Sequence, residues 1–114
     1  MKKIILTAVV AVVLGSCTST QLYSWHGYED ASYQNSKKNT PEAQAELMDQ
    51  YQKMIEKQND LRKVVPPGLY AEYGYMLYQN GKTEEGLVNL KKEIALYPES
   101  APFISRIIKQ LEKK

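Results

Sequence analysis

Few residues of this 114-residue chain are of the types that carry out chemistry, and they are not grouped. The chain has one cysteine, Cys17, and one histidine, His26. A zinc site, or a nucleophile with its base, needs several such groups at matched spacing, and the sequence contains no such spacing. The adjacent acids Glu84 and Glu85 are explained by the first turn of a helix, where negative charge is favoured. We therefore expect no enzyme, no cofactor and no metal site.

Cys17 is the one residue whose sequence context indicates a reaction. An apolar run of eleven residues, Ile4 to Leu14, follows two N-terminal lysines and is broken only by Thr7. A membrane-spanning helix needs about 20 apolar residues, so this run has the proportions of a signal-peptide core instead. The small residues Gly15 and Ser16 then stand directly before the cysteine.

The segment Leu14-Gly15-Ser16-Cys17 resembles the bacterial lipoprotein signal. This resemblance implies a signal peptide over residues 1–16 and a Cys17 thiol that receives diacylglycerol and further acyl chains such as palmitate. Two or three acyl chains hold a protein stably at a bilayer. Thr18 in place of Asp implies sorting to the outer membrane, on its periplasmic face. The alternative is an ordinary secretory peptide in which the cysteine is coincidental.

The net charge of the chain comes from the segment expected to be removed. The full chain has 15 basic and 13 acidic residues, and loss of Lys2 and Lys3 with residues 1–16 leaves 13 of each sign. A neutral domain has no basic field for nucleic acid, so no nucleic-acid partner is expected.

Residues 17–39 are rich in Ser, Thr, Gln, Asn and Lys without a helical period of apolar residues, which predicts an extended tether. It nevertheless holds the only Trp of the chain, and aromatic residues are unusual in disordered segments. The candidate partner-binding residues are Tyr23, Trp25, Tyr28 and Tyr33. They either fold back over the helices downstream or remain exposed as a contact surface, since Trp and Tyr favour interface hot spots. Stacking on peptidoglycan sugars is a third alternative.

Residues 40–114 carry the signals of about four helices and none of a strand, which predicts an all-α fold. Thr40 is a suitable N-cap and Pro41 a suitable first helical residue. The apolar stripe that follows includes Leu61 and Val65, so this helix is expected to run to Pro66.

Three further helices follow at short intervals. The second runs from about Leu69 to Asn80 and closes at Gly81, a typical residue after a helix end. Thr83 is expected to cap the third, which stops before Pro98. The fourth begins after Ser100, and its expected inner face comprises Phe103, Ile104, Ile107, Ile108 and Leu111.

The second and third helices carry a more specific pattern. Gly74, Gly81, Gly86 and Pro98 have the spacing of the small residues and the proline of a tetratricopeptide repeat, which the segment resembles over one repeat. The resemblance implies antiparallel helix pairs, with Gly74 where two helix backbones come close. Glu93 departs from the pattern, because alanine is usual there.

The whole chain after the signal resembles the domain-of-unknown-function 4810 family of short bacterial lipoproteins. The resemblance rests on Tyr23, Trp25, Gly27, Tyr28, Pro67, Gly68, Glu72, Gly74 and Gly81. It implies an assembly with other envelope lipoproteins, one of them similar to the curli-secretion channel. The family supplies no established activity. We therefore expect a non-catalytic adaptor or structural subunit in the cell envelope; the alternative is a module that binds peptidoglycan or another glycan.

The lipoprotein signal predicts that Cys17→Ala leaves an unprocessed or soluble protein, because no thiol remains to receive the lipid. Fractionation of cells, with the mass of the protein in each fraction, measures this. A Cys17→Ala variant that is cleaved and membrane-bound like the unaltered chain would contradict the signal assignment.

Overall fold

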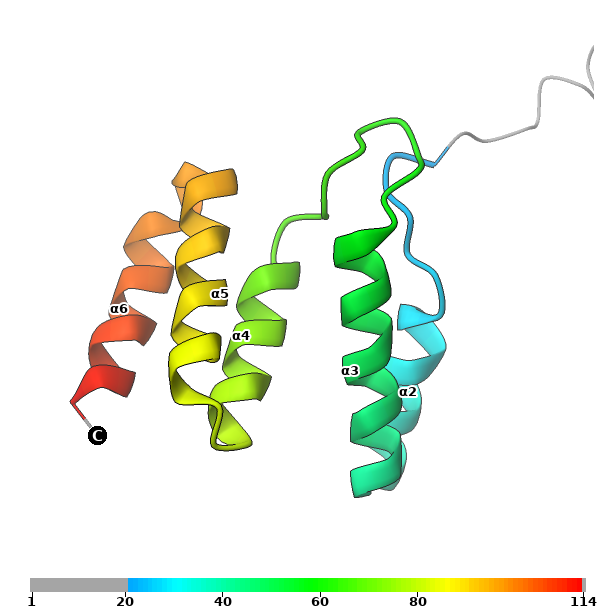
Figure 1. Cartoon of the computed structure of the whole chain (residues 1–114), viewed down its shortest axis with the longest axis horizontal. Helices are drawn as coiled ribbons and strands as arrows, with labels where there is room; N and C mark the ends of the chain where they lie inside the picture. The colour runs from blue at the N-terminus through cyan, green and yellow to red at the C-terminus, as the bar shows by residue number, and fades with distance from the viewer. Residues whose placement is uncertain (1–20, 114) are drawn as a thin grey trace, which may run out of the picture.

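The structure is a computed structural model that describes residues 21–113, and this part of the chain is helical without any strand (Figure 1). The elements are α2 (Tyr28–Lys38), α3 (Pro41–Glu56), α4 (Leu69–Gln79), α5 (Thr83–Leu96), the 3-10 turn η1 (Pro98–Ser100) and α6 (Ala101–Glu112). The all-α prediction is confirmed. Residues 1–16 and Cys17 lie outside the described residues. Between residues 21 and 113, no helix has the length and apolar character needed to cross a membrane.

Helix α3 begins where the sequence predicts and ends earlier than predicted. The Thr40 side chain accepts a hydrogen bond from the Ala43 backbone N–H at 3.2 Å, and Pro41 opens the helix. The helix stops at Glu56 instead of continuing to Val65. Beyond it, the backbone N–H groups of Asn59 and Asp60 donate to the Ser24 hydroxyl, so they are not available for helical bonds. Asn and Asp side chains also disfavour helix, because they can bond to nearby backbone groups in other conformations.

The expectation of an extended segment over residues 17–39 is wrong for its second half, which forms helix α2. This helix buries only Ala31 deeply, so it has no apolar stripe for a sequence pattern to show. Its charges favour a helix: Glu29 and Asp30 lie in the first turn, and Lys37 and Lys38 in the last. The chain then reverses at Asn39, whose φ of 50° is left-handed, and α2 packs along α3.

Helices α4 and α5 form a tight antiparallel hairpin (Figure 1). A Cβ added at Gly74 would lie 2.7 Å from the Gly86 carbonyl oxygen, and one added at Gly86 would lie 2.5 Å from the Gly74 carbonyl oxygen. The two backbones therefore touch at a pair of glycines, which confirms the expected close approach at Gly74. Gly81 follows α4 with a φ of 87°, as a residue after a helix end should.

Glu93, which stands where the repeat pattern has alanine, caps the start of the neighbouring helix α4. Its side chain is buried on α5, and it accepts hydrogen bonds from the backbone N–H groups of Gly68 and Ala71 at 3.1 to 3.2 Å. These donors belong to the start of α4, where no side chain from α4 itself provides a cap. The acid thus satisfies a helix terminus that would otherwise be buried without partners.

Two expectations at the last helices are wrong in detail. Thr83 is the first residue of α5 and makes no capping bond, and the Ser100 hydroxyl donates to the Tyr97 carbonyl oxygen instead of capping α6. Phe103, expected to face inward, is 67% exposed, whereas Ile104 and Leu111 are buried as predicted. In α6, the buried cluster with Leu90 of α5 begins at Ile104, one residue after Phe103.

The apolar core consists of two clusters. One joins α2, α3 and α4 with the loop before α4, and comprises Ala31, Leu47, Tyr51, Met54, Val65, Leu69, Tyr73 and Leu77. The other joins α5 and α6 around Leu90, Ile104 and Leu111. Helix α4 contributes to the first cluster and packs on α5, so it lies between the two halves of the molecule.

The glycine contact predicts that Gly74→Ala destabilises the fold by about 1–3 kcal/mol, because the new methyl group has no room beside a backbone carbonyl. Helix propensity alone predicts the opposite sign, since alanine is about 1 kcal/mol better than glycine in a helix. Thermal unfolding followed by circular dichroism measures the difference. A raised melting temperature would show that the backbones of α4 and α5 do not touch here.

Candidate interaction surface

The aromatic segment, residues 21–27, is docked along the loop that joins α3 to α4. The backbone N–H of Leu61 donates to the Gln21 carbonyl oxygen at 3.4 Å, and that of Arg62 donates to the Leu22 carbonyl oxygen at 3.0 Å. Figure 1 shows the aromatic segment and this loop side by side at one end of the molecule. The segment is therefore part of the folded body.

Ser24 is the residue that holds the segment to this loop. Its buried hydroxyl donates to an Asp60 carboxylate oxygen at 2.7 Å and accepts from the Asn59 and Asp60 backbone N–H groups at 2.9 and 3.2 Å. The Gln58 side chain accepts from the Ser24 backbone N–H at 2.9 Å and donates to the Ser24 carbonyl oxygen at 2.8 Å. Every polar group of Ser24 is thus paired.

The next two residues fix the segment to the loop start and to α3. His26 donates through Nε2 to the Lys57 carbonyl oxygen at 2.8 Å. The Gly27 backbone N–H donates to the Gln50 side-chain oxygen at 2.9 Å, and a Cβ at Gly27 would meet that side chain at 3.0 Å. The single histidine of the chain therefore contributes to holding the aromatic segment against the loop.

A continuous series of aromatic rings leads from this segment into the core. The centroids of Tyr23 and Trp25 are 6.2 Å apart in an edge-on arrangement, and Trp25 and Tyr28 are 5.7 Å apart. Tyr28 then contacts Tyr51 on α3 at 5.8 Å, and Tyr51 contacts Tyr73 on α4 at 5.6 Å. These separations are those of favourable aromatic pairs. The series joins the aromatic segment, α3 and α4.

Glu72 on α4 ties two of these rings together by hydrogen bonds. The same carboxylate oxygen accepts from the Tyr28 hydroxyl at 2.8 Å and from the Tyr51 hydroxyl at 3.3 Å. Burial raises the pKa of both tyrosines above the ordinary value, and the nearby Glu72 carboxylate raises it further. Both phenols therefore stay protonated at neutral pH and act as donors. We call this contact the Glu72 joint.

The four candidate partner-binding residues differ in how much of each remains accessible. Tyr23 and Tyr28 are half-buried, and Tyr23 also lies beneath the Arg62 guanidinium at 5.9 Å. Trp25 is 41% exposed although it packs between two tyrosines. Tyr33 is exposed on α2, where the Lys37 ammonium lies 5.8 Å from its ring centroid. Ring contacts join the first three, and Tyr33 lines a hollow of about 600 Å³ with His26 and Gly27 of the aromatic segment.

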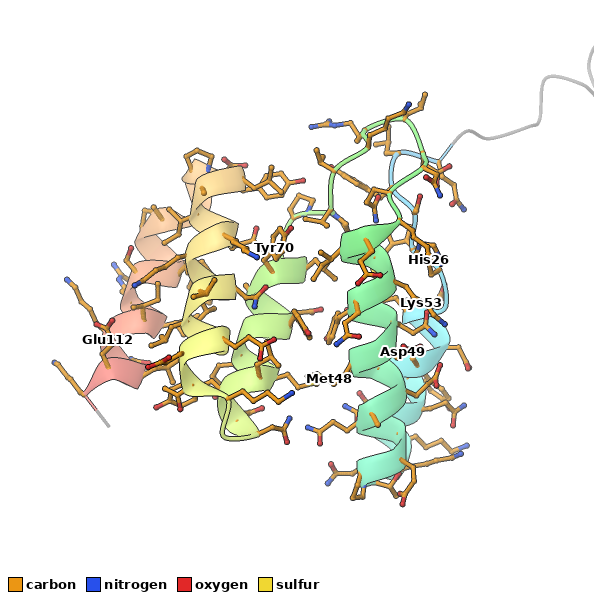
Figure 2. All side chains as sticks on the ribbon, viewed as in Figure 1. His26, Met48, Asp49, Lys53, Tyr70 and Glu112 are labelled. Atoms are coloured by element: carbon orange, nitrogen blue, oxygen red, sulfur yellow. The ribbon has the colours of Figure 1, made fainter. Side chains whose placement is uncertain are left out.

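A second surface lies where α3 faces α4 and α5. A hollow of about 450 Å³ is lined by residues that include Met48, Gln52, Tyr73 and Leu77, and a hollow of about 380 Å³ by residues that include Gln52, Ile55, Tyr73 and Val88. The two hollows share Gln52 and Tyr73, so they adjoin. We call them together the α3 groove. Figure 2 shows Met48 extending from α3 toward α4 across it.

The lining of the groove combines apolar, amide and charged side chains. The Gln52 side-chain amide donates to the Tyr73 hydroxyl at 3.2 Å across its floor. Charges of both signs stand at its edges, among them Asp49, Glu85 and Lys82. Asp49 is paired with Lys53 at 3.0 Å. Among residues 21–113, no three His, Cys, Asp or Glu side chains are placed to hold a metal ion.

Sequence reasoning missed Ser24, Gln58 and Asp60, which hold the aromatic segment, and it missed the groove. A serine between two aromatic residues gives no local signal of a partner more than thirty residues away. The groove depends on the separation of α3 from α4, which no helical period encodes. The glutamine at position 52 was readable only as an exposed helix residue.

The chain belongs to a family whose model is described as a domain of unknown function (DUF4810), which matches residues 22–107. The matched range begins in the aromatic segment and ends within α6, so the family's domain is the body described above. Neither the curated proteins nor the solved structures contain a match to this chain. The family description states no activity.

The bonding of Ser24 predicts that Ser24→Ala destabilises the fold by about 1–3 kcal/mol, because two backbone N–H groups and a carboxylate lose a shared partner in a part-buried site. The matched control is Ser36→Ala, an exposed position on α2 where alanine is the better helix former. Chemical denaturation measures both. Equal free energies of unfolding for the two variants would contradict the role of Ser24.

Proposed function

We propose that this member of the DUF4810 family is a non-catalytic adaptor of the cell envelope, anchored through lipid on Cys17 and bound to another lipid-anchored protein through the α3 groove. In this proposal the protein lies at the periplasmic face of the outer membrane. The helices act as a short tetratricopeptide-like unit. One partner is similar to the curli-secretion channel, as the resemblance of the sequence implies.

The observation that carries the adaptor role is the α3 groove. Two adjoining hollows run along one helix and face two others, which is the arrangement in which helical-repeat proteins bind a peptide or a helix. Met48, Ile55 and Val88 supply apolar contacts, and the exposed Gln52 side chain, whose amide donates to Tyr73, has a carbonyl oxygen that can accept from a partner's backbone. An apolar centre with a polar edge is the usual anatomy of a protein interface.

The tetratricopeptide-like description draws support from the α4/α5 hairpin. Its two glycines meet at a backbone contact, and α6 packs on α5 as the first helix of a following unit would. A repeat array needs about three units for stability, and this chain has fewer. The aromatic segment and α2 supply the missing cover on the other side of α3.

A glycan-binding module is the second candidate, and the surroundings of Trp25 favour it. A hollow of about 420 Å³ beside this ring is lined by Gln21, Trp25, His26, Tyr28 and Glu29. A partly exposed indole with polar neighbours is suited to stacking on a sugar ring. In this reading the aromatic segment, and not the α3 groove, contacts the ligand.

The adaptor proposal predicts that Val88→Glu lowers partner capture by tenfold or more, because a charged side chain replaces an apolar contact and must lose its water when the partner binds; hot-spot changes cost about 2 kcal/mol or more. Val88 is exposed in the groove, so the variant should keep the melting temperature of the unaltered chain. Co-purification of tagged protein from solubilised envelopes, quantified by mass spectrometry, measures capture.

The matched control is Leu96→Glu, an exposed apolar residue on the same helix outside the groove. It should capture partners at the unaltered level. If Val88→Glu and Leu96→Glu behave alike, the groove is not the binding surface. Co-sedimentation with purified peptidoglycan that is lost in Trp25→Ala, with protein capture unchanged, would support the glycan-binding alternative.

A further inference from the structure

One end of the molecule combines exposed apolar side chains with a cluster of basic ones. It consists of residues 21–22 and the loop residues 57–64, and we call it the loop tip. Leu22 is 51% exposed and Leu61 is 63% exposed, although both are large aliphatic residues. Lys57, Arg62 and Lys63 are exposed in the same loop. Such a mixture of aliphatic and basic groups is typical of surfaces that rest on a lipid headgroup layer.

The loop tip is held in shape by the described hydrogen bonds. Its two parts are joined through the carbonyl oxygens of Gln21 and Leu22, and the loop turns where the Lys63 backbone N–H donates to the Asp60 carbonyl oxygen at 3.1 Å. Asp60 is the one acid among residues 57–64, and its carboxylate accepts from Ser24. The exposed charge of the tip is therefore basic.

The position of Cys17 in the sequence sets how far this end can lie from a lipid anchor. Only five residue steps separate Cys17 from Leu22. An extended chain spans at most about 3.6 Å per residue, so the two positions cannot be more than about 18 Å apart. The described chain also begins at this end of the molecule (Figure 1). A lipid on Cys17 would therefore hold Leu22 of the loop tip within about 18 Å of the anchor.

We propose that the loop tip is a membrane-contacting surface that rests on a bilayer containing anionic lipids, with Leu22 and Leu61 in the interfacial layer and Lys57, Arg62 and Lys63 at the headgroup phosphates. This inference rests on the proposed lipidation of Cys17 and adds an orientation to it. Each basic residue near an anionic surface strengthens the contact about fivefold. The contact holds the α3 groove in a fixed orientation relative to the membrane.

Fluorescence quenching at a single introduced cysteine tests this orientation. Cys17 is the only cysteine, so after its lipidation a cysteine at position 61 is the only free thiol. The mature protein with Leu61→Cys is labelled with an environment-sensitive fluorophore and reconstituted into vesicles of phosphatidylethanolamine and phosphatidylglycerol that contain nitroxide-labelled lipid. The matched label is at Lys82→Cys, in the exposed turn at the other end of α4. Nitroxide lipids should quench the label at position 61 at least twofold more than the label at position 82.

Charge variants test the basic half of the surface. Arg62→Glu with Lys63→Glu should lower the quenching at position 61 in vesicles with phosphatidylglycerol. Lys91→Glu with Arg106→Glu makes the same charge change on exposed positions of α5 and α6 and should leave it unchanged. Because Arg62 also lies over the Tyr23 ring, Lys57→Glu with Lys63→Glu repeats the measurement without disturbing that contact.

The outcomes separate the orientation from the anchor. Mass spectrometry of the reconstituted protein reports the acyl chains on Cys17, and their absence would overturn the lipidation and with it the proposed orientation. An acylated, vesicle-bound protein whose labels at positions 61 and 82 are quenched equally would overturn the loop tip alone. Unchanged quenching in both tip charge variants would likewise contradict a contact with anionic headgroups.

Discussion

The carboxylate of Glu72 reinforces the packing of α4 against α2 and α3. Glu72 on α4 accepts hydrogen bonds from Tyr28 at the start of α2 and from Tyr51 on α3, and the Tyr51 ring packs on Tyr73. Along the same interface, Leu47 and Met54 of α3 lie in one buried cluster with Leu77 of α4, and the hollows of the α3 groove lie beside it. Because burial and the Glu72 carboxylate raise the pKa of both tyrosines, these donors keep their protons at neutral pH. The Glu72 joint therefore holds the Tyr51 ring beside Tyr73, which lines both hollows of the groove.

A small helical body without a full repeat array needs cover for its outer face, and the aromatic segment supplies it. Ser24 fastens the segment to the loop after α3, and Gln50 fastens Gly27 to α3 itself. The ring series extends the core outward from Tyr51 through Tyr28 to Trp25, which remains partly exposed. The same residues thus stabilise the fold and present a surface. The two interpretations of the aromatic segment, cover and contact, are compatible in this geometry.

Local signals predicted the parts of the fold that local chemistry determines. Thr40 and Pro41 marked the start of α3, and the spacing of Gly74 from Pro98 indicated a close backbone contact that the structure contains. Helix α2 escaped prediction because its support is electrostatic and only Ala31 is deeply buried. The early end of α3 and the cap supplied by Glu93 depend on residues more than twenty positions away, which a sequence pattern does not record. For the same reason, the sequence indicated the aromatic segment as a candidate site and gave no sign of the groove.

If the α3 groove binds another lipid-anchored envelope protein, site-specific photo-crosslinking in intact envelopes should capture that protein. A photoreactive amino acid at Val88 places the reactive group in the groove, and the same amino acid at Leu96 places it on the same helix outside the groove. We expect a discrete adduct with one lipid-anchored partner from position 88 and none from position 96. Equal crosslinking at both positions, or an adduct with peptidoglycan and no protein, would contradict it.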